Sequence, residues 1–256
     1  MKTTIGFIGG GRITKIFLEG FRYKEVEFDS VTVFDPNNET LDALANDFRV
    51  VQKAESPEEA AQAKVVVIAV HPPQVMETLD KIAGVVNEKT FVVSLAPKIT
   101  FEKMASKVKT ANIVRMIPNA TSYINEGYNP LAFHPAMLKN EKKQIKKLFK
   151  PLGKIVETEE QKLEGYAIVS AMLPTYFWFQ WQEMEAIAEK TGLSPEEAQK
   201  AVKSTLEKAI KLYYNSGLTP EEVMDLIPVK PIGDNEEEIK NTLNTKLLGL
   251  FEKIKP

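Results

Sequence analysis

Short apolar runs alternate with amphipathic stretches along the first half of the chain. The runs are rich in β-branched residues, whereas the stretches between them carry apolar residues at helical spacing. The run at 65–70 has no polar position, which is typical of a strand covered on both faces. This alternation predicts an α/β fold with a mostly parallel, doubly wound sheet. The expected strands are 4–8, 31–34, 50–51, 65–70, 91–95 and 113–117, and the expected helices are 13–21, 41–48, one from Ser56, 74–86 and 100–108.

The pattern changes after residue 151. One apolar segment, 154–156, is expected to add an edge strand, and beyond Glu160 nearly every apolar residue follows helical spacing. We therefore expect two domains, an α/β domain at 1–160 and an all-α domain at 161–256. The expected C-terminal helices are 163–190 (with Pro174 in its middle), 194–214, one from Thr219, and 234–255.

Composition and charge exclude several classes of protein. The 256 residues include 33 basic and 35 acidic side chains. The net charge of −2 lacks the excess of positive charge that is typical of nucleic-acid-binding proteins. The absence of cysteine and the presence of only two histidines exclude a disulfide framework, a thiolate nucleophile and a zinc-type metal site. No stretch is long and apolar enough to cross a membrane, and no signal-peptide pattern is present, so we expect a cytoplasmic protein without a membrane partner.

A glycine-rich turn follows the first expected strand and opens the first expected helix. Residues 9–14 read GGGRIT, in which Gly9 permits the tight turn and Gly11 lets the backbone approach a pyrophosphate. Thr14 stands where glycine or alanine usually allows close helix–strand packing. A glycine-rich turn without a ligand is the alternative, but the βαβ context predicts a dinucleotide site.

An acidic residue ends the second expected strand. A carboxylate at Asp35 can accept both adenine-ribose hydroxyls of NAD and repel the 2′-phosphate of NADP. No lysine or arginine occurs at 36–40 to bind that phosphate. The alternative is that Asp35 only initiates the Asp-Pro turn, and both roles are compatible. The pattern therefore favours NAD.

Six motifs follow one another in a specific order along nearly the whole chain. They are IGFIGGGRIT, VIAVHPPQV, SLAPKIT, VRMIPNA, SAMLPTYFW and PIGDN. In this order and spacing they resemble the pyrroline-5-carboxylate reductase family. The resemblance implies an N-terminal Rossmann domain and a C-terminal helical domain that interlocks with a partner subunit. It also implies reduction of a cyclic imine, pyrroline-5-carboxylate, to proline by NADH or NADPH.

The resemblance also implies which residues contact the cofactor. Arg12 replaces the family's usual asparagine and would add a positive charge near the phosphates, and His71 replaces a lysine beside the nicotinamide ribose. Solvent-facing side chains are the alternative at both positions. With Asp35 included, the expected cofactor-binding residues are Gly9, Gly11, Arg12, Ile13, Asp35, Val70, His71, Pro72 and Ala96.

Departures from the family pattern concentrate where the substrate is expected. In the family's helix motif, small residues stand at the positions that Met172 and Leu173 occupy here. In the loop that binds the substrate carboxylate, the family has two threonines, which Asp234 and Asn235 match best. These departures predict weak activity on pyrroline-5-carboxylate itself. The expected substrate-binding residues are Asn119, Ser170, Thr175, Asp234 and Asn235.

Imine reduction needs little acid–base chemistry from the protein, because a protonated imine is already a good electrophile. Lys98, in place of a family glycine, is the candidate proton donor or substrate-anion ligand, with an exposed loop lysine as the alternative. Two other functions stay open: a relative such as a deazaflavin-dependent NADP reductase, and a non-catalytic dinucleotide-binding sensor or assembly protein. A hydroxyacid dehydrogenase is disfavoured because no segment resembles its catalytic lysine motif.

The aromatic segment 176–181 is apolar around nearly the whole helix. Such a helix must be buried on all sides. A monomeric core helix is the alternative, but the resemblance favours burial against a second copy. We therefore expect a homodimer or a larger homo-oligomer.

Overall fold

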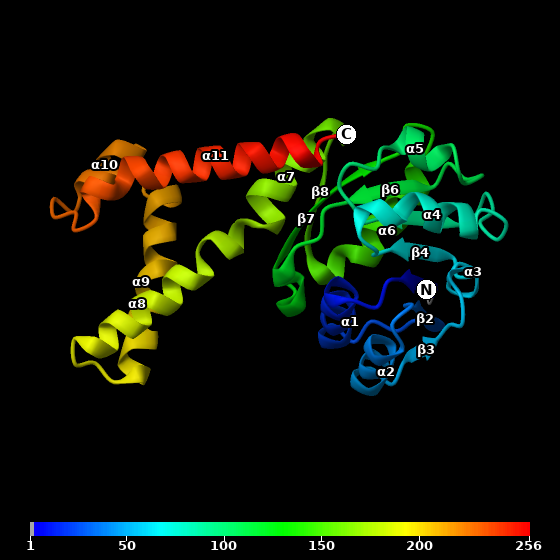
Figure 1. Ribbon diagram of the computed structural model, residues 1–256, viewed down its shortest axis with the longest axis horizontal. Helices are drawn as coiled ribbons and strands as arrows, with labels where there is room; N and C mark the ends of the chain where they lie inside the picture. The colour runs from blue at the N-terminus through cyan, green and yellow to red at the C-terminus, as the bar shows by residue number, and fades with distance from the viewer. Residues whose placement is uncertain (1–2) are drawn as a thin grey trace. The chain divides into compact units, whose positions relative to one another are not determined.

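The β-type runs of the sequence pair side by side in one sheet of eight strands (Figure 1). The structure, a computed structural model, describes residues 3–256. The strand order is β3-β2-β1-β4-β5-β6-β7-β8, and all neighbours are parallel except β6 and β7. This arrangement confirms the predicted doubly wound fold. The strands are β1 Thr4–Ile8, β2 Ser30–Phe34, β3 Val51–Lys53, β4 Val65–Ile68, β5 Phe91–Ser94, β6 Ile113–Met116, β7 Gly127–Phe133 and β8 Gly153–Glu157.

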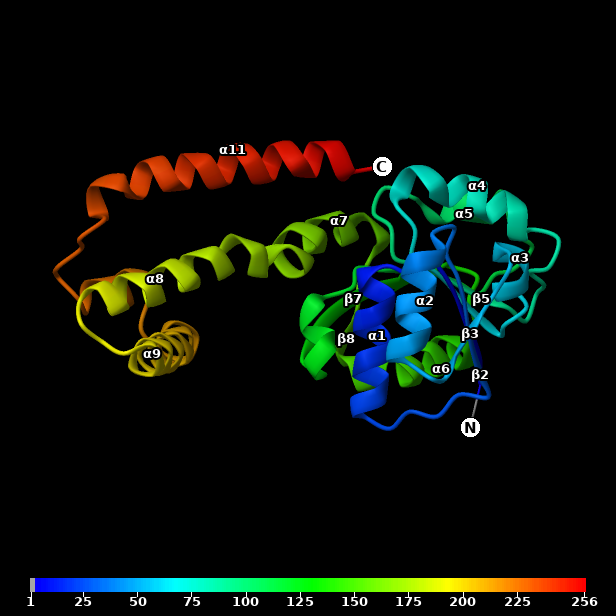
Figure 2. The same cartoon turned by 60° about the horizontal axis from the view of Figure 1, so that its bottom comes forward.

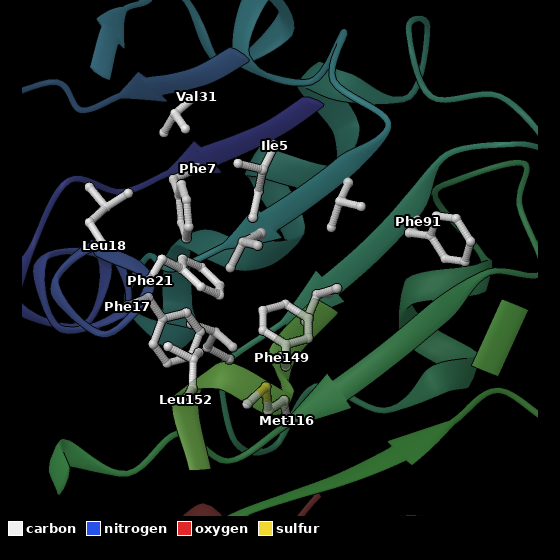
Figure 3. Packing of buried hydrophobic residues seen from close by; sticks show 14 of the residues in the cluster. Ile5, Phe7, Phe17, Leu18, Phe21, Val31, Phe91, Met116, Phe149 and Leu152 are labelled. Atoms are coloured by element: carbon white, nitrogen blue, oxygen red, sulfur yellow. The ribbon is translucent and has the colours of Figure 1, made fainter. Parts of the chain in front are cut away.

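Helices cover both faces of this sheet (Figure 2). Alternate strand residues point to opposite faces, so Ile5 and Phe7 pack against α1 and α2, whereas Ile8 and Val66 pack with α4 and α5. Figure 3 shows the first of these layers, in which Phe17 and Phe149 approach with ring centroids 5.9 Å apart. The helices are α1 Arg12–Tyr23, α2 Asn38–Asp47, α3 Pro57–Ala60, α4 Pro72–Ile82, α5 Phe101–Ala105, α6 Lys139–Phe149 and α7 Leu163–Tyr166, with 3-10 turns at Ala120–Ile124, Lys150–Leu152 and Glu160–Lys162.

One strand, β7, and one helix, α6, lie where the sequence pattern predicts neither. β7 contains Pro130, a residue that cannot donate to a ladder and is unusual inside a sheet. Its carbonyl still accepts from the N–H of Ile117 at 2.9 Å, so the strand pairs despite the missing donor. The antiparallel β7 then extends the sheet to the predicted edge strand, β8.

The long helix predicted over 163–190 is interrupted. After α7 the chain forms a π-helical turn at Ala167–Ala171 and a 3-10 turn at Leu173–Tyr176 before α8 begins at Trp178. Pro174 has no N–H to donate to the carbonyl four residues earlier, and its ring clashes with that carbonyl. The expectation of one helix through Pro174 is therefore wrong.

The described residues form two compact units: residues 3–172 with 250–256, and residues 173–249. The second unit contains α8 Trp178–Lys190, α9 Pro195–Asn215, α10 Pro220–Asp225, the 3-10 turn Gly233–Asn235 and most of α11 Glu236–Ile254. Reciprocal capping boxes at Ser194 and Thr219 begin α9 and α10, as the repeated Pro-Glu-Glu sequences indicate. The division into functional domains at residue 160 stays a prediction.

Apolar side chains are unusually exposed in the second unit. Among its residues only Ala198 is fully buried. Phe179 is 64% exposed and Ile227 is 70% exposed, and many other large apolar side chains of the unit are also exposed. So small a core contributes little hydrophobic stabilisation to this unit.

No helix within residues 3–256 is long and apolar enough to span a bilayer.

Candidate functional site

Two adjoining pockets lie in the first unit where β1, β4 and β5 end. The first lobe, of about 710 Å³, runs past the ends of β4, β5 and β6, and the second lobe, of about 430 Å³, lies on the β2 side of β1. Both lobes are lined by Gly11, Ala69, Val70 and His71. A crevice at the carboxyl ends of parallel strands, where the strand order reverses, is the usual ligand site of open α/β sheets.

The turn after β1 requires glycine at position 9. Gly9 has φ of +107°, and an added Cβ would lie 2.6 Å from the carbonyl oxygen of Ala69. The Gly9 N–H donates to Phe34 O at 2.8 Å, and the buried Thr14 hydroxyl donates to Gly9 O at 2.5 Å. Thr14, the departure from the usual small residue, therefore helps to hold the turn instead of disturbing it.

The turn fits a dinucleotide pyrophosphate. Gly11 has nothing within 4 Å of the position of an added Cβ, so the backbone is open toward both lobes. Gly11 is also the N-cap of α1, and no side chain caps that end of the helix. Amides of an uncapped first turn can bind an anion directly. Arg12 and Ile13 line the first lobe beside them, and Arg12 is exposed.

Asp35 lies at the end of β2 and lines the second lobe. Its Oδ2 accepts from Gly10 N–H at 2.7 Å and its Oδ1 accepts from Asn37 N–H at 2.9 Å. Each carboxylate oxygen has a further lone pair, so both can still accept hydroxyls from a ribose. Lys81 is the cation that lines this lobe, and it is paired with Glu77 at 2.8 Å.

The predicted residues after β4 and β5 line the first lobe. His71 is the N-cap of α4, and Pro72 follows it in the first turn. Ala96 comes from the loop after β5. Lys15 and Asp47 also line this lobe and form an ion pair at 2.6 Å, and the hydrogen bond to Asp47 raises the pKa of the Lys15 ammonium. Lys15 therefore stays charged at neutral pH.

Lys98 lies just beyond this lobe and does not line it. Its backbone has φ of +71°, which glycine adopts far more readily. Its Nζ donates to the carbonyl of Lys253 at 3.5 Å, near the C-terminal end of α11. A catalytic role for Lys98 stays a prediction.

Asn119 and Ser170 are joined in a buried network. Asn119 Nδ2 donates to Ser170 O at 3.0 Å and to Ser170 Oγ at 3.2 Å, while Asn119 Oδ1 accepts from Thr121 N–H and from the Thr121 hydroxyl. Ser170 Oγ donates in turn to Tyr128 O at 2.9 Å. The amide of Asn119 uses all four of its bonding positions. Asn119 and Ser170, two of the predicted substrate-binding residues, therefore lie together. Their contact with a substrate stays a prediction.

The other predicted substrate residues belong to the second unit. Thr175 and Asn235 line a pocket of about 610 Å³ between α8 and α11, together with Tyr176 and Leu243. Burial raises the pKa of the Tyr176 hydroxyl. Asp234 lies in the adjoining 3-10 turn. The second unit therefore brings Thr175 and Asn235 together.

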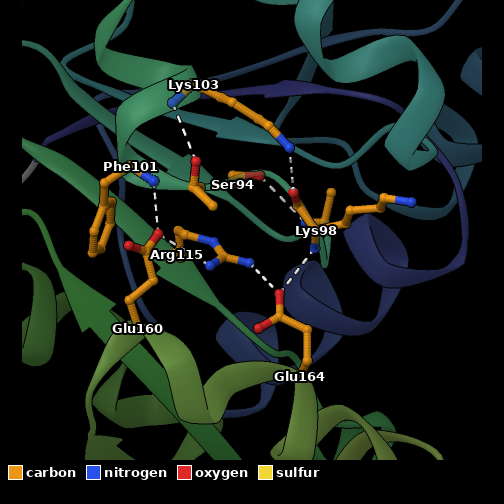
Figure 4. Close-up of polar contacts among 9 residues, drawn as sticks. Ser94, Lys98, Phe101, Lys103, Arg115, Glu160 and Glu164 are labelled. Carbon is orange, nitrogen blue, oxygen red and sulfur yellow. Dashed lines mark hydrogen bonds and ion pairs between the residues drawn. The ribbon is translucent and has the colours of Figure 1, made fainter. Parts of the chain in front are cut away.

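Sequence reasoning missed a cluster of buried charges next to the first lobe. Arg115 of β6 is 1% exposed and pairs with Glu160 at 3.1 Å and with Glu164 at 2.5 Å (Figure 4). The sequence did contain one signal, the arginine inside the apolar run IVRM. A charge buried in a strand requires a partner of opposite charge, so this arginine indicated that a carboxylate lies nearby. Nothing in the sequence indicated which carboxylates supply it.

Comparison with known proteins supports the same interpretation. Residues 4–98 match the family model described as NADP oxidoreductase, coenzyme F420-dependent. That match covers β1 to β5 and thus most of both lobes, but well under half of the chain.

Curated relatives match over nearly the whole chain. A pyrroline-5-carboxylate reductase of Corynebacterium melassecola is 22% identical over 97% of this chain and 93% of the relative. The pyrroline-5-carboxylate reductase of Escherichia coli is 25% identical over 94% of this chain and 90% of the relative.

A solved structure of Plasmodium falciparum pyrroline carboxylate reductase, with NADP bound, has a TM-score of 0.81 at 21% identity and covers 99% of this chain and 97% of that one. A solved structure of the 1-pyrroline-5-carboxylate reductase of Streptococcus pyogenes has a TM-score of 0.80 at 17% identity, and the match covers 99% of this chain and 98% of that one. These likenesses confirm the fold along the whole chain.

Proposed function

We propose that the chain, which resembles pyrroline-5-carboxylate reductases along nearly its whole length, is an NAD(P)H-dependent oxidoreductase that reduces the C=N bond of a small imine. The observation that carries the proposal is the two-lobed cleft at the ends of β1, β4 and β5, built on the Gly9 turn and the open Gly11 backbone. Whole-chain similarity to reductases of a cyclic imine supports the choice of reaction.

The chain's own residues would bind the cofactor, orient it toward the substrate and exclude water from the cleft. Amides at the start of α1, with Arg12 beside them, would hold the pyrophosphate, and Asp35 would accept hydrogen bonds from the adenine-ribose hydroxyls. Val70, His71, Pro72 and Ala96 form the wall of the first lobe. When bound, the reduced nicotinamide would supply a hydride to the imine carbon, so that the C=N π pair would pass to the protonated nitrogen and an amine would form.

Purified protein with NADH or NADPH and a panel of cyclic imines tests this function. The expected result is loss of nicotinamide absorbance that depends on both imine and protein. The match of residues 4–98 to coenzyme F420-dependent oxidoreductases favours one rival, hydride exchange between NADP and a deazaflavin. Deazaflavin reduction without any imine reduction would support that rival. Cofactor binding without turnover of any substrate would support a non-catalytic sensor or assembly protein.

We expect NADH to bind about ten- to a hundredfold more tightly than NADPH. Asp35 lines the second lobe, so the 2′-phosphate of NADPH would face its carboxylate. Residues 36–40 contain no lysine or arginine that could neutralise this phosphate. Fluorescence titration of both cofactors measures the ratio. Asp35→Ser should narrow the ratio, and Asp42→Ser, at an exposed aspartate on the outside of α2, should leave it unchanged. Equal affinities in the unaltered protein, or a preference for NADPH, would refute this expectation.

We expect the protein to be a homodimer or a larger homo-oligomer built through its C-terminal helices. The second unit has one fully buried residue and many exposed apolar side chains, and a second copy would cover them. Light scattering at micromolar concentration measures the mass. Trp178→Glu should weaken the assembly, whereas Lys190→Glu on the same helix should not. A monomer of 28.7 kDa would contradict the expectation.

The proposed ligands are a small-molecule imine and a nicotinamide cofactor, and the proposed location is the cytoplasm. Lys98 is the proposed proton donor or anion ligand, and Asn119, Ser170, Thr175, Asp234 and Asn235 are the proposed substrate-binding residues.

A further inference from the structure

Three charged side chains next to the first lobe form one connected group, which we call the Arg115 clamp: Arg115, Glu160 and Glu164. Arg115 and Glu164 are each about 1% exposed, and Glu160 is 24% exposed. One guanidinium thus pairs with two carboxylates from the segment that follows β8. Burying such charges is unfavourable unless geometry and hydrogen bonding compensate each of them.

The carboxylates of the clamp also hold the backbone of the loop between β5 and α5. Glu164 Oε1 accepts from the Lys98 N–H at 2.9 Å, and Glu160 Oε1 accepts from the Phe101 N–H at 2.6 Å (Figure 4). Both oxygens are the ones that also accept from Arg115. The loop is therefore fixed at two points, three residues apart, by charge-assisted hydrogen bonds.

One of these points is a strained residue. Lys98 is not glycine, yet its φ is +71°, a region that costs a side-chain-bearing residue free energy. Such a conformation persists only when surrounding contacts enforce it. Two contacts hold the Lys98 backbone: its N–H donates to the buried Glu164 Oε1 at 2.9 Å, and its carbonyl accepts from Lys103 Nζ at 3.4 Å. The contact with Glu164 belongs to the clamp.

The residues just before Lys98 form a wall of the first lobe. Leu95, Ala96 and Pro97 line it, and they follow β5 directly. With the pyrophosphate at the Gly9–Gly11 turn and the adenosine half on the β2 side, the β4–β5 side receives the nicotinamide half. Displacement of this wall therefore alters contacts to the nicotinamide half and leaves the second lobe intact.

We propose that Arg115, Glu160 and Glu164 are positioning residues, which set the β5–α5 loop and thereby the fit of the nicotinamide half of the cofactor. This inference rests on the proposed function. It assigns to the clamp a role in cofactor geometry in addition to stability.

The test compares NADH with ADP-ribose, which has the same adenosine, pyrophosphate and second ribose but lacks the nicotinamide ring, on the full chain. Glu164→Gln keeps the size of the side chain but removes the charge that pairs with Arg115. We expect its dissociation constant for NADH to rise about tenfold or more, since misplacement by an ångström is costly, with ADP-ribose bound as before. Glu159→Gln is the matched control, because Glu159 is 69% exposed and pairs with Lys162 on the surface. It should bind both ligands as the unaltered protein does.

A second variant covers the case in which Glu164→Gln does not fold, as judged by circular dichroism and thermal melting. Glu160→Gln changes a partly exposed member of the clamp and should show the same split between NADH and ADP-ribose. Unchanged NADH affinity in a folded clamp variant, or equal loss for both ligands, would overturn the positioning role alone. Failure of the unaltered protein to bind either ligand would overturn the proposed function, and the positioning role with it.

Discussion

Gly9→Ala is expected to lower NADH affinity by at least about a hundredfold, which corresponds to roughly 2.7 kcal/mol. The substituted Cβ would lie 2.6 Å from Ala69 O and 2.7 Å from Ala69 C, and both are backbone atoms. The φ of +107° is strained for alanine whatever space is available. The β1–α1 turn must therefore move away from β4, and the pyrophosphate amides move with it.

Calorimetric titration of NADH against Gly9→Ala measures this loss, and thermal melting shows whether the variant is folded. Gly84→Ala is the control, since nothing lies within 4 Å of its added Cβ and its backbone is not in the left-handed region. A folded Gly9→Ala variant that binds NADH as tightly as the unaltered protein would show that the turn does not bind the cofactor.

Pyrroline-5-carboxylate itself is expected to be reduced about 10²- to 10³-fold more slowly than is typical of an enzyme with two hydroxyl donors in the substrate loop. The carboxylate of Asp234 is an acceptor in place of a hydroxyl donor, and its charge opposes a substrate carboxylate. Met172 and Leu173 add apolar bulk where the family has small residues. A neutral or cationic imine should be the better substrate.

Steady-state rates on pyrroline-5-carboxylate and on a cyclic imine without a carboxylate test this expectation. Asp234→Thr with Asn235→Thr should raise the rate on the carboxylated imine, and Asp225→Thr, on α10, should not. Turnover of pyrroline-5-carboxylate above about one per second by the unaltered protein would prove the expectation wrong.

Most of the sheet follows from the sequence because buried parallel strands have a simple signature. The run VVVI of β4 has no polar position, and all of its residues are buried. β7 lacks that signature, because Asn129 and Pro130 interrupt its apolar run. Pro174 stands in the sequence, but the helical spacing around it led to the wrong prediction of one helix. The observed π-helical turn and 3-10 turn depend on tertiary contacts such as the Asn119–Ser170 bonds.

Residues of the candidate site could be predicted from the sequence only where they directly follow a predicted strand. Gly9 and Asp35 follow strands of the same sheet, so the sequence places both at its carboxyl edge. The carboxylates that pair with Arg115 lie 45 and 49 residues away, beyond any local pattern. The full use of the Asn119 amide by Ser170 and Thr121 is likewise a property of the folded chain.

Hydride transfer from a nicotinamide to an imine carbon can be followed with an isotope. NADH carrying deuterium at the transferable position of the nicotinamide is incubated with the protein and the imine panel, and the amine products are analysed by mass spectrometry and NMR. We expect one deuterium at the former imine carbon of at least one product, formed together with oxidised cofactor and absent without the protein. Cofactor bound under these conditions with no deuterium in any amine would show that the protein does not transfer hydride to these imines.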